Sequence, residues 1–104
     1  MQESDLISKA FVIGARETVR GFHLIGVPGQ EASEPSAILE SLDYALEHDF
    51  ALIVLSASAA YKIEDTLESI RLETQTPIIV ISDVNLKVDM KDLEKKFRKF
   101  IGIH

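Results

Sequence analysis

The sequence contains no cysteine, so it has neither a disulfide framework nor a thiolate metal site. It also lacks a long hydrophobic run, because its longest apolar segments, 50–55 and 77–81, fall far short of the roughly 20 residues that cross a bilayer. The first five residues have neither the basic nor the apolar region of a signal peptide. These absences favour a protein of a reducing compartment, without direct membrane insertion.

Motifs of common active and cofactor sites are missing as well. Gly14 is followed by Gly21, which does not match the three-glycine dinucleotide fingerprint, and no Gly-Lys-Ser or Gly-Lys-Thr is present to hold phosphates. Neither Ser56 nor Ser58 lies in a Gly-x-Ser-x-Gly context. The spacing of the three histidines, at positions 23, 48 and 104, indicates no metal site. We therefore expect no catalytic residue, no bound cofactor and no metal.

Charge divides the 104 residues unevenly, although the length predicts a single domain. Residues 1–86 carry five Lys or Arg against fourteen Asp or Glu, a charge of −9. Residues 87–104 carry six against three, a charge of +3. The net charge of −6 argues against nucleic acid as a partner, because most of the surface would repel phosphates. The pattern predicts an acidic body (1–86) joined to a basic terminal helix (87–104) within one domain unit.

Apolar segments of strand and helix character alternate along the body. Strands are expected at 9–14, weakly at 30–33, at 50–55 and at 78–81; helices are expected at 16–25, from Pro35 to about 47, and from about 58 to Thr76. Such alternation is typical of an α/β fold with a doubly wound parallel sheet, and right-handed crossovers favour the strand order 2-1-3-4 of the flavodoxin and receiver type.

Several local features refine this prediction. Val19, Phe22 and Ile25 share one face of the first helix, and Gly26 is a natural stop. The segments 50–55 and 78–81 are apolar throughout, as in strands that are covered on both faces. Ser56 or Ser58 is expected to cap the helix that follows.

The terminal helix has an apolar stripe flanked by basic residues. Three interpretations fit it: the stripe packs on the body, it docks onto an apolar groove of a partner, or the helix lies on a membrane surface. The acidic body makes the membrane surface the less attractive of these. The stripe and its flanking charges are Met90, Leu93, Phe97, Arg98, Lys99, Phe100 and Ile101.

The segment from Gly14 to Val27 resembles the first strand and helix of the F-subunit family of V-type and archaeal A-type ATPases. That family has the pattern Thr-Val-x-Gly-Phe-x-Leu-x-Gly-Val after a glycine. The matching residues are Gly14, Thr18, Val19, Gly21, Phe22, Leu24, Gly26 and Val27. Segments 50–56, 76–81 and 93–102 are similar to later elements of the family, so the resemblance covers nearly the whole chain.

The resemblance implies a non-catalytic rotor protein, peripheral to the membrane on the cytoplasmic side. It implies binding to the D-subunit coiled coil of the central stalk, which turns inside a ring of catalytic and regulatory head subunits. Such a stalk couples ATP hydrolysis or synthesis to proton or sodium-ion transport. Leu93, Phe97, Phe100 and Ile101 would then be apolar anchors, with Arg98 and Lys99 as flanking charges.

Two other interpretations remain open at this point. The same frame occurs in receiver-like regulatory modules, but a phosphoacceptor aspartate is expected where this chain has Ser56. The third interpretation is a small enzyme that uses Ser56 or His23.

Overall fold

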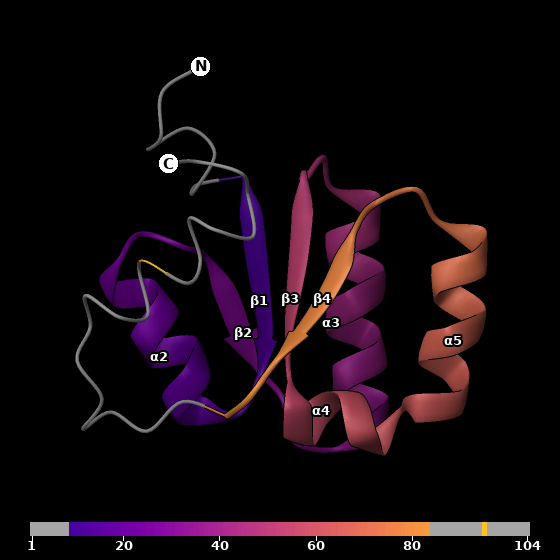
Figure 1. Cartoon of the computed structure of the whole chain (residues 1–104), viewed down its shortest axis with the longest axis horizontal. Helices are drawn as coiled ribbons and strands as arrows, with labels where there is room; N and C mark the ends of the chain where they lie inside the picture. Colours follow the sequence, from indigo (N-terminus) through magenta and orange to yellow (C-terminus); the bar gives the residue numbers. More distant parts are fainter. Residues whose placement is uncertain (1–8, 84–94, 96–104) are drawn as a thin grey trace.

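A four-stranded parallel sheet forms the centre of the computed structural model, which describes residues 9–83 and Lys95 (Figure 1). Its strands are β1 (Ala10–Gly14), β2 (Gly29–Glu31), β3 (Leu52–Ser56) and β4 (Ile78–Ile81). The helices between them are α2 (Arg16–Leu24), α3 (Pro35–Glu47), α4 (Ala57–Lys62) and α5 (Glu64–Glu73).

The strands lie in the order β2-β1-β3-β4, which confirms the predicted topology. Val12 of β1 is in register with Gly29 on one side and Val54 on the other, and Val54 is in register with Ile79 of β4. The second strand, which the sequence predicts only weakly, is present as β2, although it has only three residues and two of them are exposed.

Two apolar clusters cover the two faces of the sheet. Phe11, Ile13, Ile53 and Leu55 pack in the cluster that includes α3, α4 and α5. The alternate strand residues, Ala10, Val12, Leu52 and Val54, pack in the cluster that includes α2. This alternation follows from the two-residue period of a strand. Figure 1 accordingly shows α2 on one side of the sheet and the other three helices on the opposite side, which confirms the doubly wound arrangement.

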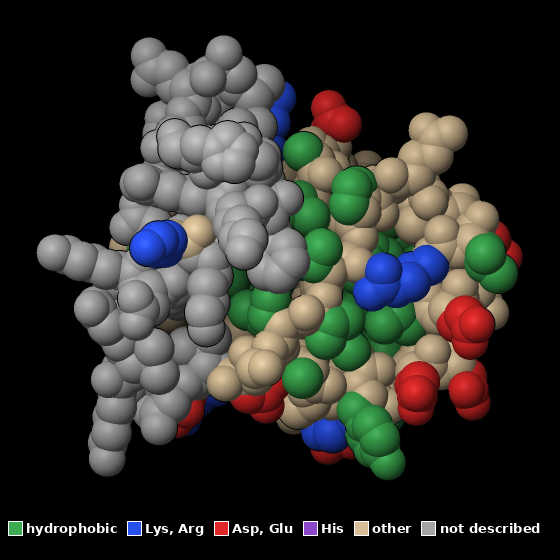
Figure 2. Space-filling view, viewed as in Figure 1, with side chains coloured by type: hydrophobic (Ala, Val, Ile, Leu, Met, Phe, Trp, Pro, Cys, Tyr) green, Lys and Arg blue, Asp and Glu red, His purple; other side chains and the backbone are tan. Residues whose placement is uncertain are grey.

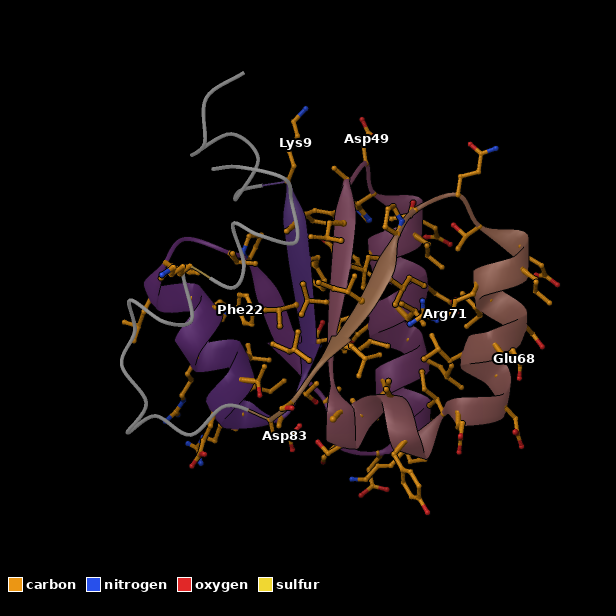
Figure 3. The ribbon with its side chains drawn as sticks, viewed as in Figure 1. Lys9, Phe22, Asp49, Glu68, Arg71 and Asp83 are labelled. Carbon is orange, nitrogen blue, oxygen red and sulfur yellow. The ribbon has the colours of Figure 1, made fainter. Side chains whose placement is uncertain are left out.

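Helix α2 has the predicted apolar face and the predicted end. Val19 and Phe22 are buried, Ile25 packs against the same cluster, and the chain leaves the helix through Gly26 at a φ of +93°. Figure 3 shows the Phe22 side chain directed from α2 towards the sheet. A positive φ at the residue after a helix C-cap favours glycine, because it has no Cβ.

The predicted helix after β3 is two helices that meet at Ile63. Ile63 has φ −122° and ψ 25°, values that interrupt the helical backbone. Its side chain is buried, as is that of Leu67, so the break leaves both predicted apolar residues in the core. No glycine or proline lies at the break, so the sequence does not signal it.

The expectation that residues 78–81 are covered on both faces is wrong. Only Ile78 is buried, and Val80 is 39% exposed. The reason is topological: β4 is the last strand in the order, so it is hydrogen-bonded to a described strand only on its β3 side. An edge position leaves an apolar strand partly open to solvent.

The predicted terminal helix lies outside the described residues, apart from Lys95, which is exposed. The proposed stripe and flanking charges therefore stay predictions, and so does the division of the chain at residue 86. They are Met90, Leu93, Phe97, Arg98, Lys99, Phe100 and Ile101.

Leu42→Ala should lower the free energy of unfolding by about 2–5 kcal/mol, because Leu42 is fully buried under the sheet and its truncation leaves a cavity. Chemical denaturation measures this change. The matched control is Leu72→Ala on α5, where the side chain is 85% exposed and the expected change is within about 0.5 kcal/mol. Equal losses in the two variants would contradict the core described above.

Candidate functional site

The carboxyl ends of β1 and β3 are the place where parallel sheets of this topology usually bind ligands. In this chain Gly14 ends β1 and Ser56 ends β3, and the strand order reverses between them. Figure 3 shows this end of the sheet near Asp83, with Lys9 and Asp49 at the opposite end.

The Ser56 side chain fills the space between the two strands. It is fully buried, and its hydroxyl oxygen accepts hydrogen bonds from the amides of Ala15 at 3.0 Å and Ala59 at 3.3 Å. Its Oγ also lies 3.3 Å from the Oγ of Ser58. Ser56 is thus the N-cap residue of α4, which confirms one of the two predicted caps.

Gly14 is required by this packing. Its φ is +136°, and a Cβ built on it would lie 2.1 Å from the Ser56 Oγ and 2.9 Å from the Ser56 Cβ. Such distances are far below van der Waals contact. Residues that carry a side chain also rarely adopt this φ. The glycine that ends β1 therefore allows the backbone of β1 and the Ser56 side chain to lie close together.

The end of β4 is attached to the same region. The Ser58 amide donates a hydrogen bond to the Asp83 carboxylate at 3.1 Å. Three strand ends therefore meet at the start of α4 through groups of the chain itself. The described hydrogen-bond partners of the Ser56 hydroxyl are two amides and one hydroxyl, and none of these is the base that a nucleophilic serine needs.

The histidines and carboxylates form no second candidate centre in the described part of the chain. His23 is exposed on α2, and His48 follows α3 and stacks on Tyr44 with ring centroids 3.9 Å apart. Within residues 9–83 and Lys95, no three His, Asp or Glu side chains gather closely enough to hold a metal ion. Over the same residues, no helix has the length and hydropathy needed to span a membrane.

The residues of the Gly14 to Val27 motif are mostly inside the molecule. Thr18, Val19, Gly21, Phe22 and Val27 are buried. Val27 begins the return to β2, and its amide donates to the Phe22 carbonyl at 2.9 Å. Leu24 differs from these residues, because its side chain is 70% exposed on the outer face of α2.

The outer face of α2 also holds a feature that the sequence analysis did not single out. Arg16 and Arg20 both approach one carboxylate oxygen of Glu31, at 3.8 and 3.6 Å from their Nε atoms. The four-residue spacing of the arginines is visible in the sequence, but their pairing with a strand residue fifteen and eleven positions away is not.

Comparison with known protein families supports the resemblance. The family model described as "ATP synthase (F/14-kDa) subunit" matches residues 10–97. The chain belongs to this family. A search among individual curated proteins found no match.

The residues that match the family model can be compared with the elements of the fold. It begins at the first residue of β1 and includes the whole described sheet with its four helices. It also includes Met90, Leu93 and Phe97 of the predicted stripe, whereas residues 98–104 follow the end of the match. The family match thus covers the body from residue 10 onward and the first part of the basic segment.

Gly14→Ala should destabilise the protein by about 2–5 kcal/mol, because the new methyl group collides with Ser56 and the backbone φ is strained. In a Ser56→Ala background the same change should cost less, because the nearest colliding atom is gone. Denaturation of both single variants and the double variant gives the coupling free energy. Strict additivity of the two changes would show that the contact does not constrain residue 14.

Proposed function

We propose that this chain is a non-catalytic component of the central stalk, or rotor, of a V-type or A-type rotary ATPase. It binds the D-subunit coiled coil and turns with it inside the head of catalytic and regulatory subunits. In this role it helps to couple ATP hydrolysis or synthesis to proton or sodium-ion transport. The match to the ATP synthase family over residues 10–97 carries the proposal.

The geometry at the carboxyl end of the sheet supports a non-catalytic role. The place where a ligand would enter is filled by the buried Ser56 hydroxyl, whose acceptor capacity is used by two amides. A receiver-like module is a weaker alternative for the same reason, because a phosphoacceptor needs an exposed carboxylate at this position. A protein-binding role through outer surfaces agrees with both observations.

In this proposal the terminal segment binds the stalk through its apolar stripe. Met90, Leu93, Phe97, Phe100 and Ile101 are the anchors, and Arg98 and Lys99 orient the approach to the partner. The complex lies in the cytoplasm against the membrane, where this chain needs no contact with lipid or nucleic acid.

Co-purification from the source cells tests the assignment. A chain with an N-terminal tag should recover the stalk and head subunits, as identified by mass spectrometry. A chain that ends at Val88 should recover them weakly or not at all, because it lacks the stripe. A full-length chain that runs as a lone monomer and recovers no component of the ATPase would overturn the proposal.

Phe97→Ala combined with Phe100→Ala should weaken the affinity for the stalk coiled coil by tenfold or more. Burial of two phenylalanine side chains contributes on the order of 3–6 kcal/mol before the costs of ordering. Isothermal titration calorimetry measures the affinity, and Leu72→Ala is the control for loss of an exposed apolar side chain on α5. Unchanged affinity in the double variant would show that the stripe is not part of the interface.

A further inference from the structure

We draw no further inference here: the strongest candidate, the edge of β4 that faces away from β3, with the partly exposed apolar side chains of Ile79, Val80 and Ile81 and the acidic surface shown beside it on the α5 side in Figure 2, carries none, because nothing in the described part of the chain shows what covers it.

Discussion

The buried hydroxyl of Ser56 is the contact on which the carboxyl end of the sheet depends. It accepts hydrogen bonds from the first residue after β1 and from α4, and the next serine in the chain, Ser58, is held by the Asp83 carboxylate beyond β4. Because Ser56 comes so close to β1, residue 14 has to be glycine. In related topologies this space receives a ligand. Here the chain itself fills it, so the proposed binding functions are assigned to outer surfaces of the protein.

Those outer surfaces differ because the two faces of the sheet are covered unequally. Three described helices lie on one face, and their solvent side is strongly acidic. Helix α2 is the described helix on the other face, and its solvent side carries two arginines and an exposed leucine. The two arginines are matched by Glu17 and Glu31, so the α2 side is close to neutral while the other side is acidic, and a charged partner can distinguish the two sides before any close contact forms. In the proposed stalk role, such a difference would favour one orientation of the protein.

The strand order was predictable because alternating elements and right-handed crossovers leave few arrangements for four parallel strands. The burial of β4 was mispredicted because its apolar composition was given more weight than its place at the edge, where Val80 is exposed. The break at Ile63 has no sequence signal, since no glycine or proline lies there. The Ser56–Gly14 contact joins residues 42 positions apart, and local patterns do not report a contact of this kind.

The residues that reveal the family and the residues that we propose to bind a partner are largely different sets. Thr18, Val19, Phe22 and Val27 are inside the molecule, so their pattern reports how α2 packs against the sheet and returns to β2. Leu24 belongs to the same pattern yet lies outside, where burial in the free chain gives no reason for an apolar side chain. Single exposed leucines are common on protein surfaces, and leucine also favours a helical backbone, so the core of the body does not depend on this side chain. Leu24 lies in line with Arg16 and Arg20 on the outer face of α2, outside the core that the other motif residues build.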